Sequence, residues 1–402
     1  MAEAEPIKLR LSRSVTIPDP LRLARYLRAP ELGPKVLFFS GGTALNDLSR
    51  HLTAYTHNSI HLVTPFDSGG SSAKLRDAFQ MLSVGDMRSR LMALANRTVT
   101  GHPDIYRLFA YRLPRDEDAA ALQARLERMV TGDDELVTAI PDPMRKIIRN
   151  HLRFFLQAMP SDFDLRGASI GNLILAGGYL NNDRHIDPVV FMFSKLVEVQ
   201  GTVRTITSDF LHLAARLADG RVIVGQRNLT GKETDPIDSP VAELYLTDDP
   251  SGQHQVQPEI RNKIRSLIGE AELICYPMGS YYSSVIANLL PSGVCQAIAE
   301  NRCPKVYIPN TGEDPEQINL SLTDSVETLL RYLRRGSGEL TESTDLLSLV
   351  VIDSDHRHYR GPVDIPAIRR MGTEVVEANL VTQQSYPYIG SDKVLNVLLS
   401  LI

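Results

Sequence analysis

The sequence predicts an α/β protein with a Rossmann-like, mainly parallel sheet that is flanked by helices and carries a helical insertion. Apolar runs of strand length alternate with helical segments in both halves of the chain. The first strand, helix and strand follow one another within about 30 residues, as a βαβ unit requires. A long, purely helical pattern covers residues 103–159. We therefore expect a single domain over residues 1–402, with 103–159 as an insertion within it.

The first βαβ unit begins with residues 35–40, an apolar run that ends at Gly41 and Gly42. Such a run predicts a buried parallel strand followed by a tight turn. Thr43 is placed to cap the next helix, whose apolar face has leucines at helical spacing. These leucines are Leu45, Leu48 and Leu52. Residues 59–64 predict the second strand, which enters a turn rich in glycine and serine.

The middle of the chain is predominantly helical. Apolar residues recur at helical spacing in 119–129 and 144–159, and no strand signal lies between residues 103 and 159. Residues 169–180 and 187–198 predict two further helices.

Strands return in the second half. Residues 202–207, 211–217 and 221–228 predict three strands, and the Asp219-Gly220 pair between the last two is typical of a hairpin. Segment 232–257 is rich in Asp, Gly, Pro and Ser and is expected to include an exposed loop. The elements expected after it are a helix to Ile268, a strand at 273–276, a helix from Ser283, a strand at 305–309, a helix at 321–335, strands at 347–353 and 374–380, and a helix at 391–399.

Composition narrows the class of protein. A net charge of −5 without a block of Lys and Arg argues against a nucleic-acid partner. The three cysteines, Cys275, Cys295 and Cys303, are too few for a disulfide framework and predict reduced thiols. No apolar run approaches the about 20 residues of a membrane helix, and residues 1–13 lack the pattern of a signal peptide. We expect a soluble cytoplasmic protein without a membrane partner. A homodimer is possible, and the sequence does not decide it.

The turn after the first strand is the first candidate binding element. Gly41 and Gly42 allow close approach of the backbone to a ligand, and the next helix offers N–H groups to a phosphate. Thr43 and Asn46 add polar side chains. The pattern matches neither a dinucleotide fingerprint nor a P-loop, so an ordinary tight turn stays an alternative.

The loop after the second strand, residues 67–76, is the second candidate. Its backbone amides and hydroxyls are suited to line an anion pocket, with two cations to neutralise phosphate charge. Asp67 is placed to bind Mg²⁺ that bridges phosphates, and it is the candidate catalytic residue. A flexible loop with solvated charges is the alternative. The further candidates in this loop are Ser68, Gly69, Gly70, Ser71, Ser72, Lys74 and Arg76.

Two later segments add candidates. Arg88 follows Asp86 at a helix start, where Asp86 is expected to be the N-cap and Arg88 to reach the anion site. The loop after strand 273–276 contains Gly279-Ser280, a second candidate anion cradle. Tyr281 or Tyr282 is suited to stack on a base, although at least one of them is expected to be packed in the core.

One polar cluster has a less specific pattern. Asp353, Asp355, His356 and His358 resemble a metal-binding group, but a strand that runs into a polar loop explains them equally well. The sequence leaves metal binding there undecided. The motifs of α/β-hydrolases and of zinc enzymes do not occur.

Taken together, these segments resemble the superfamily of the 2-phospho-L-lactate transferases (CofD-like) and the gluconeogenesis factors (YvcK-like), over roughly residues 35–310. The resemblance is carried by Ser40-Gly41-Gly42-Thr43-Ala44 against GGGTG, residues 67–76 against DDGGSSGRLR, Gly85-Asp86-Met87-Arg88, Gly171-Asn172-Leu173, the hairpin 217–225, and residues 278–290 against GPGSLYTS-x-x-x-NLL. Ala44 and Met278 replace glycines of the pattern, and Ser68 replaces its second acid. The chain therefore resembles a divergent CofD-like subgroup.

The resemblance implies a core that binds a nucleotide diphosphate or a nucleotide-sugar, and it adds Asn172 to the candidate binding residues. In the transferase branch it implies transfer of a phospho-linked group from a nucleotide-activated donor, with Mg²⁺, and that enzyme is the leading hypothesis. The alternative is a non-catalytic regulator that binds a UDP-sugar, which the exchange of an acid for Ser68 favours. A nicotinamide-dependent dehydrogenase is the weakest hypothesis, because no acidic ribose anchor follows the first turn at the usual spacing.

Overall fold

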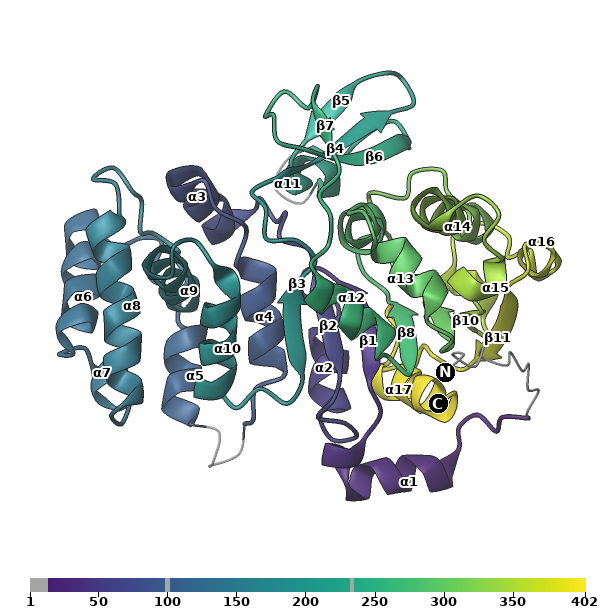
Figure 1. The fold of residues 1–402 in the computed structure, drawn as a ribbon, viewed down its shortest axis with the longest axis horizontal. Coiled ribbons are helices and arrows are strands. Elements are labelled where there is room, and N and C mark those ends of the chain that lie inside the picture. Colours follow the sequence, from purple (N-terminus) through teal and green to yellow (C-terminus); the bar gives the residue numbers. More distant parts are fainter. Residues whose placement is uncertain (1–13, 98–101, 232–234) are drawn as a thin grey trace, which may run out of the picture.

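The computed structural model describes residues 14–97, 102–231 and 235–402. They form a seven-stranded parallel sheet between helices, a helical lobe and a small antiparallel sheet (Figure 1). This arrangement confirms the predicted fold class. The strands of the large sheet are β1 (Val36–Ser40), β2 (Ile60–Val63), β3 (Thr202–Thr205), β8 (Leu273–Tyr276), β9 (Lys305–Tyr307), β10 (Leu349–Asp353) and β11 (Glu374–Ala378).

The strand order is β11-β10-β9-β8-β1-β2-β3, and every neighbouring pair is parallel. The chain thus moves outward from β1 to β3 and then starts again on the other side of β1 with β8. This is the Rossmann order. In open α/β sheets, ligands bind at the carboxyl ends of the strands where the order reverses, which here lies between β1 and β8.

The central strand β1 shows why both faces of the sheet are covered. Its five residues are all buried, as expected for a parallel strand between two helix layers. Because side chains alternate along a strand, Leu37 and Phe39 pack into one apolar cluster, whereas Val36 and Phe38 pack into another. The first cluster contains residues of α12 (Asn262–Gly269), α13 (Val294–Glu300) and α14 (Leu322–Ser337), and the second contains residues of α2 (Asn46–Leu52) and α17 (Ser391–Ser400).

The elements that surround the large sheet are mostly short helices. They are α1 (Pro20–Arg28), η1 (Pro30–Leu32), α2 (Asn46–Leu52), α12 (Asn262–Gly269), the π-helical turn η3 (Tyr281–Val285), η4 (Ile286–Leu289), α13 (Val294–Glu300), α14 (Leu322–Ser337), α15 (Ser343–Leu346), η5 (His356–His358), α16 (Ile365–Arg370) and α17 (Ser391–Ser400).

A helical lobe is inserted between β2 and β3, on the left of Figure 1. It has an apolar cluster of its own, in which Phe155 and Phe193 pack. The described part of 103–159 is helical apart from its connecting loops, as predicted, but the lobe is longer than that segment. Its helices are α3 (Gly70–Phe79), α4 (Gly85–Ala93), α5 (Pro103–Ala110), α6 (Ala119–Thr131), α7 (Glu135–Thr138), α8 (Met144–Ala158), α9 (Ile170–Asn181) and α10 (Ile186–Leu196).

The second sheet has the order β5-β4-β6-β7 and lies above the large sheet in Figure 1. The predicted hairpin at Asp219-Gly220 is confirmed, and Gly220 adopts a φ of 90° that favours glycine. One expectation was wrong: the strand expected at 221–228 ends at Val224, and the helix α11 (Gln226–Thr230) follows it. The described part of segment 232–257, which was expected to include an exposed loop, also contains β6 and β7. The strands are β4 (His212–Leu217), β5 (Val222–Val224), β6 (Val241–Thr247) and β7 (Gln255–Val256).

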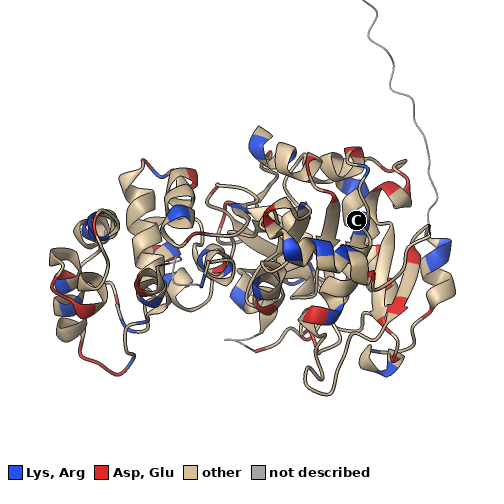
Figure 2. Cartoon of the chain, turned by 90° about the horizontal axis from the view of Figure 1, so that it is seen from below, with Lys and Arg blue, Asp and Glu red and all other residues tan. Residues whose placement is uncertain are grey.

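Within the described ranges, no helix is both long and apolar enough to cross a membrane. Figure 2 shows basic and acidic residues interspersed over the helices on the face that it presents, without a continuous basic stripe.

Candidate functional site

Three cavities lie in a row along the carboxyl edge of the large sheet. The cationic pocket, about 960 Å³, lies beyond β1 and β2 and reaches the helical lobe. The acidic pocket, about 540 Å³, lies at the switch point between β1 and β8. The outer pocket, about 590 Å³, lies beyond β9 and β10. Thr43 lines both the cationic and the acidic pocket, and residues 310–315 line both the acidic and the outer pocket.

The turn after β1 forms the border between the first two pockets. A Cβ on Gly41 would lie 2.5 Å from Ser284 Oγ and 3.2 Å from Thr64 Oγ1, so only glycine fits there. Gly41 and Gly42 line the acidic pocket. The expectation that Thr43 caps the next helix was wrong, because α2 begins three residues later, at Asn46, after Leu45.

Arg90, which the sequence analysis did not select, fixes this turn. Its guanidinium is fully buried and donates to the carbonyls of Gly41 and Gly42, at 3.3 Å each, and to Ser49 Oγ at 2.6 Å. Because N–H and C=O of one trans peptide point in opposite directions, the N–H groups of Gly42 and Thr43 face away from Arg90. Burial lowers the pKa of Arg90 to about 10, so it stays charged at neutral pH. In the sequence, Arg90 could have been found from its position four residues after Asp86, which places both side chains on one face of α4.

Asn46 lies behind the turn and lines neither pocket. Its Nδ2 donates to Ser89 Oγ at 2.8 Å, and Ser89 does line the cationic pocket. Asn46 therefore contacts a residue of the pocket lining and does not line the pocket itself.

The loop after β2 forms one wall of the cationic pocket. Asp67 Oδ1 accepts the N–H of Gly69 at 3.0 Å, and Ser68 Oγ accepts the N–H of Arg227 at 3.0 Å, which ties the loop to the helix α11. Gly70, with a φ of 48°, starts α3. The residues of this loop that line the pocket are Asp67, Gly69, Gly70, Ser71, Ser72 and Lys74, whereas Ser68 does not.

Arg76 is a correction to the predicted site. Its side chain is buried and donates to the carbonyls of Pro65, at 3.0 Å, and Leu211, at 2.7 Å. It also lies over the ring of Phe210, 5.0 Å from the centroid. Burial lowers its pKa to about 10. Because Arg76 faces the loops behind α3 and lies outside the lining of the cationic pocket, it braces those loops and does not neutralise a ligand there.

The cations of the pocket all belong to the segment between β2 and β3 that forms the helical lobe. Lys74 Nζ pairs with Asp164 Oδ2 at 2.7 Å, and Arg88 Nε donates to Asn172 Oδ1 at 2.8 Å. Burial, and next the charge of Arg112, lower the pKa of Arg88 to about 10. The full set is Lys74, Arg88, Arg112, Arg115 and Arg166, against Asp67, Asp86 and Asp164. Sequence reasoning missed Arg112, Arg115 and Arg166 because they belong to loops of the helical lobe and follow no strand.

Asp86 is a further correction. Helix α4 starts at Gly85 after Val84, so Asp86 lies inside the first turn and is not the N-cap. It is only 9% exposed and lines the cationic pocket. A Cβ on Gly85 would lie 2.2 Å from Ser72 Oγ and 3.0 Å from Asp67 Oδ2. Glycine at 85 thus allows α4 to approach the Asp67 loop.

The two tyrosines after β8 belong to the core. Tyr281 and Tyr282 are each 1% exposed and pack edge to face, with ring centroids 5.1 Å apart. The hydroxyl of Tyr281 donates to the carbonyl of Ser325, and that of Tyr282 to the carbonyl of Val241 at 3.4 Å. Neither ring is open to a nucleobase, so the expected stacking role was wrong for both.

The turn at Gly279-Ser280 is not an open anion cradle. The N–H of Gly279 donates to Asn310 Oδ1 at 2.9 Å. The N–H of Tyr281 donates to Asp314 Oδ2 at 2.8 Å. Those of the next two residues donate to Glu316 Oε2, at 2.7 and 2.8 Å. Side-chain oxygens of Asn310, Asp314 and Glu316 thus accept most of the N–H groups that were expected to bind phosphate. Gly279 and Ser280 line the acidic pocket.

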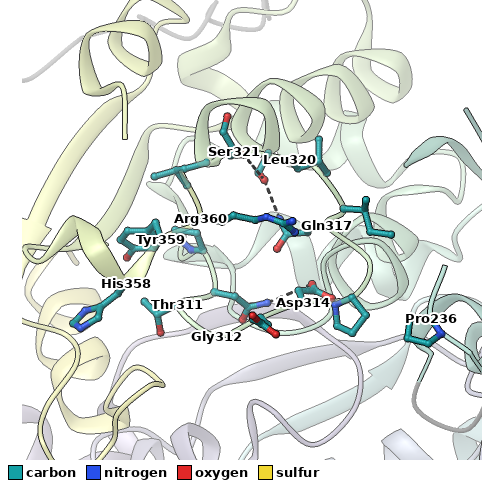
Figure 3. A pocket seen from close by; sticks show the side chains of 17 residues that line it. Pro236, Thr311, Gly312, Asp314, Gln317, Leu320, Ser321, His358, Tyr359 and Arg360 are labelled. Carbon is teal, nitrogen blue, oxygen red and sulfur yellow. Dashed lines mark hydrogen bonds between the residues drawn. The ribbon is translucent and has the colours of Figure 1, made fainter. Parts of the chain in front are cut away.

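The outer pocket contains part of the predicted metal cluster. Figure 3 shows the side chain of Arg360 reaching between Tyr359 and Gln317, with His358 at the edge. Asp353 accepts three backbone N–H groups at 2.7 Å and pairs with His358 Nδ1 at 3.1 Å, so its oxygens are already engaged. In the ranges that the structure covers, no group of three or more His, Cys, Asp or Glu side chains is arranged to bind a metal ion.

Fold and site together define a Rossmann-order protein with an elongated polar groove at its switch point. A family model for "2-phospho-L-lactate transferase CofD" matches residues 36–381. The chain therefore belongs to the CofD family.

Relatives with curated names are gluconeogenesis factors. The putative gluconeogenesis factor of Thermoanaerobacterium thermosulfurigenes is 27% identical over 375 residues, which cover 92% of this chain and 97% of that protein. The gluconeogenesis factor of Bacillus subtilis is also 27% identical, over 88% of this chain and 92% of that protein. A crystal structure of a UPF0052 family member from Bacillus halodurans has a TM-score of 0.66 at 21% identity, covering 91% of this chain and 99% of that one. That structural likeness supports the fold.

Proposed function

We propose that this protein is a regulator of the gluconeogenesis-factor type that binds a nucleotide-sugar in the groove, with the diphosphate in the cationic pocket. The observation that carries the proposal is the convergence of five basic side chains on one cavity beside the switch point. The N-terminal residues of α3 line the same cavity, and a helix N-terminus favours negative charge. The named relatives are gluconeogenesis factors, which supports regulation over transfer.

The geometry around Asp67 also supports binding over chemistry. One oxygen of Asp67 accepts a backbone N–H within its own loop, and Ser68, where the resembled pattern has a second acid, accepts another. Because Ser68 has a hydroxyl where that pattern has a carboxylate, the loop contains only one of the two acids that the transferase hypothesis would use. The function proposed here therefore differs from the leading sequence hypothesis.

The transferase stays the second candidate, because the matching family model carries that description. Asp67 and Asp86 both line the cationic pocket, and a Mg²⁺ ion bound by phosphates commonly needs only one or two protein carboxylates. These two residues would bind the ion, which would neutralise diphosphate charge. Lys74 and Arg88 would orient the phosphates in either hypothesis.

A calorimetric titration with UDP-glucose, UDP-N-acetylglucosamine and GDP, each with and without Mg²⁺, tests the proposal. We expect at least one UDP-sugar to bind and to be recovered unchanged after prolonged incubation. Conversion of a bound donor that is lost in Asp67→Asn would support the transferase instead. Absence of binding by every nucleotide would refute both.

A further inference from the structure

The acidic pocket differs in charge from the cationic pocket beside it. Its charged lining residues, within the described chain, are Asp47, Glu313 and Asp314, all of them acidic. Asp47 lies 3.9 Å from Arg50, which offsets part of its charge. Glu313 is exposed and Asp314 is half-buried, both on the segment that follows β9. Basic side chains thus predominate in the cationic pocket, and the charged side chains described in the lining of the acidic pocket are all acidic.

At the end of β8, most of the backbone donors that could offset this acidity are already in use. Asn310, Asp314 and Glu316 accept the N–H groups of residues 279 and 281–283, as described above. Glu316 is 1% exposed, and Ser283 Oγ also donates to it. A carboxylate that enters the pocket beside Glu313 and Asp314 would therefore meet negative side chains, and the N–H groups of residues 279 and 281–283 would not be open to it.

A second observation is a buried hydroxyl group in the lining of the pocket. Ser40, the last residue of β1, lines the acidic pocket and is only 3% exposed. Its Oγ has no hydrogen-bond partner among the described residues. A buried hydroxyl without a partner destabilises the fold, so a bound hydroxyl group that pairs with it would be favoured.

We propose that the acidic pocket binds the uncharged, hydroxyl-rich sugar of the nucleotide-sugar, and that Glu313 and Asp314 select against sugars that carry a carboxylate. This inference rests on the proposed function, because it assigns the diphosphate to the cationic pocket. Carboxylates accept hydrogen bonds from sugar hydroxyls, whereas two like charges at close range repel each other. Thr43, which borders both pockets, then lies between the diphosphate and the sugar.

Two probes that differ at one carbon test the proposal. UDP-glucose and UDP-glucuronate differ only in a CH₂OH or COO⁻ group on the sugar. By calorimetry at low salt, we expect the wild-type protein to bind UDP-glucose about tenfold or more tightly than UDP-glucuronate. The ratio is expected to fall as salt is added, since salt screens repulsion.

Glu313→Gln and Asp314→Asn are the variants that decide the assignment. Each is expected to narrow the ratio, mainly by strengthening the binding of UDP-glucuronate. Glu313→Gln is the primary variant because Glu313 is exposed, whereas Asp314 also accepts a backbone N–H. Glu339→Gln, which removes an exposed acid outside the lining of this pocket, is the matched control and should leave the ratio unchanged.

The outcomes separate this inference from the proposed function. The inference is wrong, while the proposed function stands, if UDP-glucose and UDP-glucuronate bind equally well. The same holds if Glu313→Gln and Asp314→Asn both keep the affinity ratio of the wild-type protein, because the sugar then does not lie in the acidic pocket. If neither probe binds, the proposed function itself fails, and the inference fails with it.

Discussion

At the scale of single residues, the border between the two pockets depends on a buried guanidinium. Arg90 donates to two consecutive carbonyls, those of Gly41 and Gly42, and so orients the peptide groups of the turn. Its pKa of about 10 means that the charge is retained despite burial. The burial of Arg90 is what brings its guanidinium within hydrogen-bond distance of both carbonyls.

Replacing Arg90 by Met should therefore destabilise the fold and weaken ligand binding. Loss of the guanidinium leaves buried carbonyls without a donor, which costs about 1–3 kcal/mol in free energy of unfolding. Urea denaturation measures this change. Arg153→Met, at an exposed position of α8, is the control and should change stability by no more than about 0.5 kcal/mol. Equal stability of the two variants would contradict the bracing role of Arg90.

Gly85 offers a second test at this scale. In Gly85→Ala the new methyl group would clash with Ser72 Oγ and press on Asp67, so the Asp67 loop must shift. We expect a clear loss of UDP-sugar affinity and of thermal stability. Gly269→Ala, where the methyl group meets nothing within 4 Å, should cause neither. Ser72→Ala added to Gly85→Ala should restore part of the loss, and a failure to do so would place the clash elsewhere.

At the scale of elements, the junction between β8 and the π-helical turn is closed by residues from beyond β9. Glu316 accepts two backbone N–H groups of that turn while fully buried. Burial, followed by the charge of Asp314, raises the pKa of Glu316 to about 8. The folded protein therefore retains a proton that the unfolded chain releases near its ordinary pKa.

This retained proton predicts a pH dependence with a definite sign. Because the folded pKa exceeds the unfolded one, the contribution of Glu316 is most favourable at low pH and is lost as pH rises toward about 8. Glu316→Gln should thus gain stability relative to wild type between pH 5 and about 8. Urea denaturation of both proteins across that range measures the difference. A difference that does not change with pH would show that Glu316 titrates normally.

The sequence predicted the helices and strands better than it predicted the side chains of the candidate site. Residues 35–40 and 273–276 match β1 and β8 because buried parallel strands leave continuous apolar runs. The strand expected at 221–228 was cut short by α11, since local propensity does not reveal where a tertiary contact ends a strand. Tyr281 and Arg76 were misplaced for a related reason. A motif gives the residues near a site, but not which side chains turn into the core.

At the scale of the whole molecule, the candidate site is assembled from two parts of the chain. The sheet edge supplies the Asp67 loop, and the lobe between β2 and β3 supplies Arg112, Arg115 and Arg166. No local pattern connects these segments, because the lobe folds back on the sheet only through long-range packing. The sequence could therefore predict the phosphate-facing loops, but not the arginines that complete the pocket.

A ligand that bridges sheet and lobe should stabilise both together. At about 100 times its dissociation constant, a ligand adds about 2.7 kcal/mol to the free energy of unfolding. We expect saturating UDP-glucose to slow amide hydrogen exchange in the loop of Arg112 and Arg115 as well as in the Asp67 loop. Protection of the sheet edge alone would show that the lobe does not take part in binding.

The most direct test of the central claim, that the lobe completes a diphosphate site, is the affinity of Arg112→Gln for UDP-glucose measured by calorimetry. Loss of one charged hydrogen bond to phosphate should weaken binding about ten- to a hundredfold. Arg107→Gln, which removes a 67% exposed side chain of the same lobe, is the control and should bind as wild type does. Unchanged affinity in Arg112→Gln, or an equal loss in both variants, would contradict the account.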